Sequence, residues 1–135
     1  MIQNYGISLK INVCVQKLNC EEDFEDLFTQ TAPERIKILQ MIIIDSVNEH
    51  SQCDTCTTYE FNKFVKRHLR HNIVVQNAEY MVNACAIINT AGNLISDICG
   101  KRRIIGNTLR ESFSELIKRS DLDVSKFSRK YRSAE

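Results

Sequence analysis

Two cysteines and two histidines have the residue types and the spacing of a zinc site. Cys53 and Cys56 are followed by His68 and His71 in the pattern C-x2-C-x11-H-x2-H. A tetrahedral zinc ion takes four thiolate or imidazole ligands, so this set supplies a complete shell. The eleven residues between Cys56 and His68, and the two between His68 and His71, are each one fewer than the shortest intervals of zinc fingers. We therefore predict no metal site and keep zinc binding as an alternative.

The familiar motifs of enzymes are missing from the chain. It contains no glycine-rich phosphate loop, no H-E-x-x-H pair and no G-x-S-x-G turn. Cys56 and His68 are a nucleophile and a base by residue type only. The sequence therefore predicts no catalytic residue, no cofactor and a protein that binds rather than catalyses.

The composition is that of one ordinary globular domain over residues 1–135. Hydrophobic residues make up 43% of the chain and charged residues 26%. The 18 Lys and Arg side chains are balanced by 17 Asp and Glu, so no net field attracts nucleic acid. We interpret the basic run from Lys63 to Arg70 as a solvated helix face, and nucleic acid is not a favoured partner.

Localisation signals are also missing. The N-terminus has no basic region followed by an apolar run, and no segment has the length and apolarity of a membrane span. The six cysteines are then expected to be reduced thiols. These features predict a cytoplasmic protein without a membrane span.

A long apolar stretch from Val75 to Cys99 dominates the fold prediction. Its apolar residues recur at three- and four-residue spacing, and small residues such as Ala84 and Ala91 lie on several faces. A helix that is apolar nearly all round is surrounded by other helices. Gly100 is placed to terminate it. The stretch therefore predicts a buried central helix at about 75–99.

Capping boxes predict further helices around this centre. They begin at Thr31, Thr57 and Thr108, each followed three residues later by Glu, and Asp121 is placed to cap a last helix. Residues 7–15 alternate as a strand does, but no second convincing strand is visible, so we choose a helix there. The predicted fold is an all-α bundle of six or seven helices.

This helix order resembles the B-cell-lymphoma-two (Bcl) family of apoptosis regulators, in particular its compact viral members. A Phe-bearing helix leads into a long central helix, a basic turn and an amphipathic helix at about 108–117. The family's Asn-Trp-Gly-Arg motif falls on residues 76–79. Ala78 matches its small residue, whereas Glu79 replaces the arginine that pairs with the ligand. The resemblance covers residues 57–131.

The resemblance implies an inhibitor of host apoptosis in the cytoplasm of an infected cell. A pro-apoptotic partner would lay an amphipathic death-motif helix into an apolar groove beside the central helix. The implied groove is lined by Phe61, Phe64, Val65, Leu69, Ala78, Glu79, Tyr80 and Met81. For each apolar side chain in this set, core packing is the competing interpretation.

Two alternatives remain from the sequence. The first is a zinc module that regulates transcription or binds nucleic acid, with Cys53, Cys56, His68 and His71 as ligands. The second is a helical scaffold that forms a homodimer and has no ligand groove. Bound zinc distinguishes the first alternative, and an occluded groove distinguishes the second.

Overall fold

The computed structural model describes residues 5–44, 47–98 and 101–132. The chain divides into two compact units. The N-terminal unit comprises Met1–Ile42 and Ser51–Ala78, and the C-terminal unit comprises Ile43–His50 and Glu79–Glu135. Both contain a β-sheet, so the predicted all-α bundle is wrong. The prediction of a single domain over residues 1–135 is not tested by this division.

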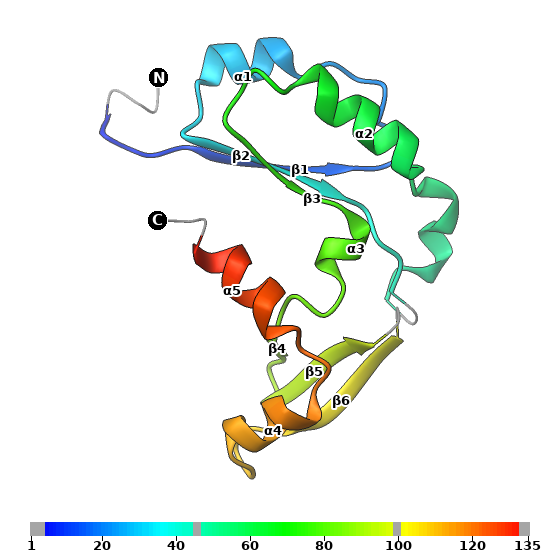
Figure 1. Cartoon of the computed structure of the whole chain (residues 1–135), viewed down its shortest axis with the longest axis vertical. Coiled ribbons are helices and arrows are strands. Elements are labelled where there is room, and N and C mark those ends of the chain that lie inside the picture. The colour runs from blue at the N-terminus through cyan, green and yellow to red at the C-terminus, as the bar shows by residue number, and fades with distance from the viewer. Residues whose placement is uncertain (1–4, 45–46, 99–100, 133–135) are drawn as a thin grey trace. The chain divides into compact units, whose positions relative to one another are not determined.

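A three-stranded parallel sheet is the centre of the N-terminal unit. Its strand order is β1-β2-β3, with β1 at Lys10–Val15, β2 at Arg35–Gln40 and β3 at Ile73–Gln76. Helix α1 (Glu25–Thr31) connects β1 to β2; the 3-10 segment η2 (Glu49–Asp54) and helix α2 (Thr58–Arg67) precede β3. Helices α1 and α2 cover the same face of the sheet (Figure 1). The connections are therefore β-α-β crossovers, as parallel pairing requires.

The core of this unit lies between the sheet and its two helices. Every second residue of β1 and β2 points into it, because side chains alternate across a strand. The buried members are Val13, Val15, Cys20, Phe28, Ile36, Ile38, Cys56, Phe61 and Phe64. The remaining positions of β1 and β2 therefore point to the opposite face of the sheet, which we call the open face.

Helix α2 begins where its local sequence predicts. The Thr57 side chain accepts a hydrogen bond from the Glu60 amide at 3.2 Å, and Glu60 accepts one from the Thr57 amide at 2.8 Å. This reciprocal capping box satisfies two amides that a helix start leaves unpaired. Phe61 and Phe64 follow on the buried side, whereas Leu69 lies beyond the helix and is exposed.

Two N-terminal segments differ from the predicted helices. Residues 7–15 contain β1, so their alternation indicated the correct structure and our choice of a helix was wrong. The box at Thr31 and Glu34 does not start a helix. Thr31 ends α1, Ala32 adopts a left-handed conformation, and β2 begins at Arg35. The strand that pairs with β1 is therefore β2, which lies in the segment predicted to be a helix starting at Thr31.

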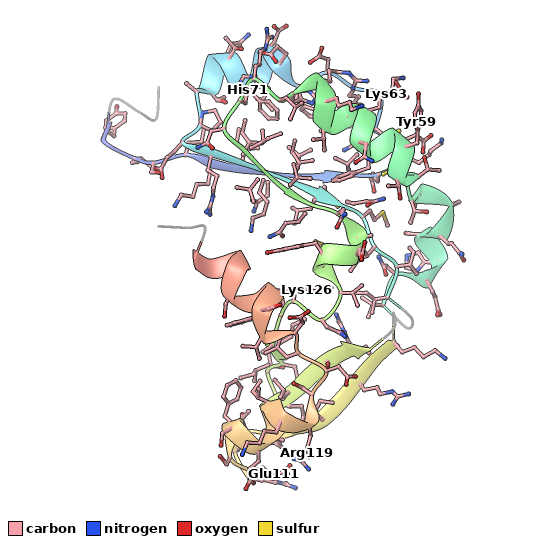
Figure 2. All side chains as sticks on the ribbon, viewed as in Figure 1. Tyr59, Lys63, His71, Glu111, Arg119 and Lys126 are labelled. Carbon is pink, nitrogen blue, oxygen red and sulfur yellow. The ribbon has the colours of Figure 1, made fainter. Side chains whose placement is uncertain are left out.

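The C-terminal unit contains an antiparallel sheet of three strands. Strand β4 is Ile87–Ile88, β5 is Asn93–Ile98 and β6 is Lys101–Asn107, in the order β4-β5-β6. Helix α4 (Phe113–Arg119) follows the sheet and buries Leu116. Gly106 permits this close packing, because a Cβ atom there would lie 2.5 Å from Leu116 Cδ2. Glu111 and Arg119 form an ion pair beside it (Figure 2).

The predicted central helix is absent. Residues 75–98 instead contain the end of β3, the short helix α3 (Ala78–Met81), β4 and β5. Asn83 and Gly92 have φ angles of 59° and 79°, which a right-handed helix excludes. The remaining positions of that prediction, Cys99 and its terminator Gly100, lie outside the described residues.

The last two helices agree in part with the predictions. Helix α4 begins after Ser112 rather than at the predicted Thr108 box. Helix α5 (Val124–Arg132) is capped by Asp123, which accepts hydrogen bonds from the Ser125 and Lys126 amides at 3.0 Å, and not by Asp121. Among the helices described, none is long and apolar enough to cross a membrane.

Candidate functional site

The four residues of the zinc motif do not form a site. Cys53 is exposed, whereas Cys56 is buried with its sulfur 3.6 Å from the carbonyl oxygen of Val15. His71 lies 2.8 Å from a carboxylate oxygen of Glu25. In residues 5–44, 47–98 and 101–132, no group of three or more His, Cys, Asp or Glu side chains is placed to hold a metal ion.

His68 is a core residue whose ring nitrogens are both occupied. It is fully buried, and its Nε2 accepts a hydrogen bond from the Phe24 amide at 3.0 Å. Its Nδ1 lies 2.9 Å from the carbonyl oxygen of Phe64, so Nδ1 carries the proton and donates it. The ring also packs against Phe28 with centroids 5.4 Å apart. No lone pair of this ring is left for zinc, so His68 gives the zinc-module alternative no support.

The residues predicted to line a groove are divided between the two units. Phe61 and Phe64 are completely buried in the N-terminal core, and Val65 packs against that core. The other predicted residues of this unit are the exposed Leu69 and the half-buried Ala78.

The remaining groove residues belong to the C-terminal unit. The Tyr80 hydroxyl donates to the carbonyl oxygen of Lys126 at 3.5 Å, and the Lys126 ammonium donates to the carbonyl oxygen of Glu79 at 3.0 Å. Met81 is half-buried. These contacts join α3 to α5 within the unit.

A second polar site lies on the open face of the parallel sheet. Lys10, Asn12, Arg35 and Lys37 occupy the strand positions that alternate with the buried Val13, Ile36 and their neighbours. Parallel pairing aligns Lys10 with Arg35 and Asn12 with Lys37. Adjacent strands are about 4.8 Å apart, so each aligned pair forms a short row across the two strands. One row is Lys10 and Arg35, the next is Asn12 and Lys37, and we call them the cationic rows.

The charged residues at the paired strand positions of the open face are all cationic. Continuing the register, Lys37 is aligned with Val74, and Leu39 with Cys14 and Gln76. The aligned strand positions on this face thus include two lysines and an arginine but no carboxylate. Lysine and arginine side chains in such an arrangement recognise phosphate groups by charge-assisted hydrogen bonds.

Sequence reasoning missed this site, although a signal for it was present. The segments KINVCV and RIKILQ each place cationic or amide side chains at alternate positions. A parallel sheet buried on both faces has strands that are apolar throughout, so polar alternate positions indicate a face with another role. The sequence did not show that these two segments are neighbours.

Carboxylates with perturbed pKa values lie on the helix side of the unit instead. The pKa of Glu25 falls to about 2, because Arg70, His71 and Thr29 donate hydrogen bonds to it, with Arg70 contributing most. The pKa of Glu60 also falls to about 2, chiefly through Lys17 and then through the capping box with Thr57. These ion pairs fix α1 and α2, and neither carboxylate is on the open face.

These two carboxylates predict a loss of stability in acid. Their folded-state pKa values lie below the ordinary value of 4.5, so the unfolded chain binds more protons between pH 4.5 and about 2. The stabilisation is complete above this window and is lost as the pH falls through it. We expect the free energy of unfolding in urea, followed by circular dichroism, to fall more steeply with acid for the unaltered chain than for a Glu25→Gln/Glu60→Gln variant. Equal slopes would contradict the assignment.

Three bacterial proteins are similar in sequence to this chain. Each is named an S-adenosylmethionine-dependent nucleotide dehydratase. The protein from Flammeovirga pacifica is 30% identical over 98 residues, which are 71% of this chain and 34% of the relative. The protein from Lacinutrix mariniflava is 25% identical over 128 residues, which are 93% of this chain and 27% of the relative.

The third relative, from Selenomonas ruminantium, is 24% identical over 130 residues, which are 95% of this chain and 47% of the relative. The chain thus spans between 27% and 47% of the length of these curated relatives. No protein-family model matches the chain.

These similarities contradict the apoptosis interpretation. The relatives are bacterial and are named as enzymes, whereas we expected a viral, non-enzymatic Bcl-like protein that binds pro-apoptotic partners. The resemblance depended on the order of helices, and the long central helix on which it rested is absent, because its residues form the end of β3, the short helix α3, β4 and β5. The two alternatives, a zinc module and a helical scaffold, also have no support. This chain is similar over most of its length to part of S-adenosylmethionine-dependent nucleotide dehydratases.

Proposed function

We propose that this chain is the nucleotide-binding part of an S-adenosylmethionine-dependent nucleotide dehydratase, and that the open face of its parallel sheet binds the phosphates. The rows formed by Lys10, Asn12, Arg35 and Lys37 carry this proposal. The relatives are named as enzymes that act on nucleotides, which suggests a nucleotide as the ligand. The cationic side chains can donate charge-assisted hydrogen bonds to its phosphates.

The lack of carboxylates at the aligned strand positions of the open face supports a phosphate ligand over a cationic one. A phosphate chain spreads several negative charges over many acceptor oxygens, and Lys and Arg donate to them. The Asn12 amide adds an uncharged donor in the row of Lys37. The open face thus offers cationic and neutral donors at neighbouring positions, as extended phosphate groups require.

S-adenosylmethionine fits the cationic rows poorly. Its reactive sulfonium is positively charged, so Lys10, Arg35 and Lys37 would repel it. The cationic side chains attract the phosphates of a nucleotide, and we assign none of these side chains to the sulfonium of S-adenosylmethionine. These side chains therefore account for the binding of phosphate groups alone.

Calorimetric titration of the chain with nucleoside triphosphates tests the proposal. We expect CTP, UTP, GTP or ATP to bind, inorganic tripolyphosphate to compete, and the corresponding nucleoside without phosphate to bind far more weakly. Rising salt should weaken the binding, since dissolved ions screen the attraction between the cationic side chains and the phosphates. If none of the triphosphates binds, the proposal is wrong.

A further inference from the structure

Gln76, at the C-terminal end of the parallel sheet, has an unpaired acceptor. It is the last residue of β3 and is 2% exposed, and its side-chain oxygen Oε1 is buried without a hydrogen-bond partner. Leaving a buried polar atom unpaired is destabilising, so such atoms in folded proteins call for an explanation.

A neighbouring glutamine in the same unit has hydrogen-bond partners for both polar atoms of its side chain. Gln40, the last residue of β2, donates from Nε2 to the carbonyl oxygen of Cys56 at 3.4 Å. Its Oε1 accepts from the Ala78 amide at 3.0 Å. Gln40 therefore has a structural role, whereas the acceptor of Gln76 has no such role.

The register places Gln76 on the same face as the cationic rows. Leu39 is aligned with Gln76 and Lys37 with Val74, so Gln76 is one row beyond Lys37 and one strand away. With about 3.3 Å per residue and about 4.8 Å between strands, the Cα atoms of Lys37 and Gln76 are about 8 Å apart.

We infer that the Gln76 Oε1 accepts a hydrogen bond from the nucleoside part of the ligand whose phosphates bind the cationic rows. The inference rests on the proposed function. The donor is an N–H of the base or a hydroxyl of the ribose, since these are the groups that a nucleoside offers to an acceptor. Adenosine in S-adenosylmethionine offers the same groups, so the experiment must separate these two sources.

The test compares the unaltered chain with Gln76→Met, which keeps the length of the side chain and removes the acceptor. The ligands are CTP, UTP, GTP, ATP, S-adenosylmethionine and tripolyphosphate, titrated calorimetrically. We expect at least one nucleotide to bind about three- to tenfold more weakly to the variant, with tripolyphosphate unchanged. The matched control is Gln52→Met, the same substitution at an exposed residue of the N-terminal unit.

Each other outcome has a distinct meaning. A loss confined to S-adenosylmethionine identifies its adenosine as the donor and overturns the nucleotide as the source. An equal loss for tripolyphosphate means that the substitution disturbs the sheet, which overturns the inference. Unchanged affinities for nucleotides that bind also overturn it, with water as the partner of Gln76. No binding of any triphosphate overturns the proposed function itself.

A second measurement keeps the inference testable if the variant does not fold. The unaltered chain is titrated with 2′-deoxy and 3′-deoxy forms of a nucleotide that binds, and with an analogue that lacks the donor groups of the base. We expect one of these deletions to weaken binding about three- to tenfold. If all of them bind as tightly as the parent nucleotide, Gln76 receives no hydrogen bond from the nucleoside.

Discussion

Replacing Lys37 with alanine is expected to weaken the binding of a nucleoside triphosphate about 10- to 100-fold. Lys37 lies at the centre of the open face, between Asn12 on β1 and Val74 on β3. A hydrogen bond to a charged group contributes about 1.5–3 kcal/mol, and at about 1.4 kcal/mol for each factor of ten this is a loss of roughly one to two orders of magnitude in affinity. Titration calorimetry of the variant and the unaltered chain measures the difference.

Lys66→Ala is the matched control for charge. Lys66 is exposed on α2 and lines a pocket of about 300 Å³ together with Tyr59, Asn62 and Lys63. Tyr59 and Lys63 project from α2 (Figure 2). We expect Lys66→Ala to leave nucleotide affinity within about twofold. If this variant loses affinity and Lys37→Ala does not, the phosphates bind at α2 and our assignment of the site is wrong.

Replacing His68 with alanine is expected to destabilise the chain by about 3 kcal/mol. The substitution removes a ring that is in contact with Phe28 and Phe64 and leaves the Phe24 amide without its acceptor. Loss of a large buried side chain and an unpaired buried amide both contribute to this value. The free energy of unfolding in urea, followed by circular dichroism, measures it.

Two further variants separate the causes. His68→Phe retains an aromatic ring and removes the acceptor, so it should cost only the hydrogen-bond part, about 1–3 kcal/mol. His50→Ala changes an exposed histidine and should alter stability by less than about 0.5 kcal/mol. Stabilisation of the unaltered chain by added zinc, lost in His68→Ala, would contradict the core role and restore the zinc interpretation.

Some elements were determined by local sequence. The capping box of Thr57 and Glu60 and the apolar spacing of Phe61 and Phe64 predicted α2, because these interactions form within one or two turns of a helix. The alternation of residues 7–15 likewise indicated a strand. In the first case both residues of the capping box lie within one short segment. In the second case the segment is long enough to show the complete alternation of a strand.

Other elements misled because short apolar runs do not distinguish a strand from a helix. The run from Ile36 to Ile44 has helical spacing, yet its first part pairs with β1 and β3. In the stretch from Val75 to Cys99, asparagine, glycine, threonine and β-branched residues are weak helix formers, and Asn83 and Gly92 turn the chain. In this stretch the residue types outweigh the helical spacing of the apolar side chains.

The candidate site was decided by tertiary structure alone. The sequence by itself determined that Lys10, Asn12, Arg35 and Lys37 stand at alternate positions of their segments, and that α2 begins at Thr57. Only the parallel pairing of β1 with β2 brings Lys10 beside Arg35, which is 25 residues away in the chain. The physical reason is that a strand's hydrogen-bonding groups are satisfied by a partner distant in sequence, so no local pattern names that partner.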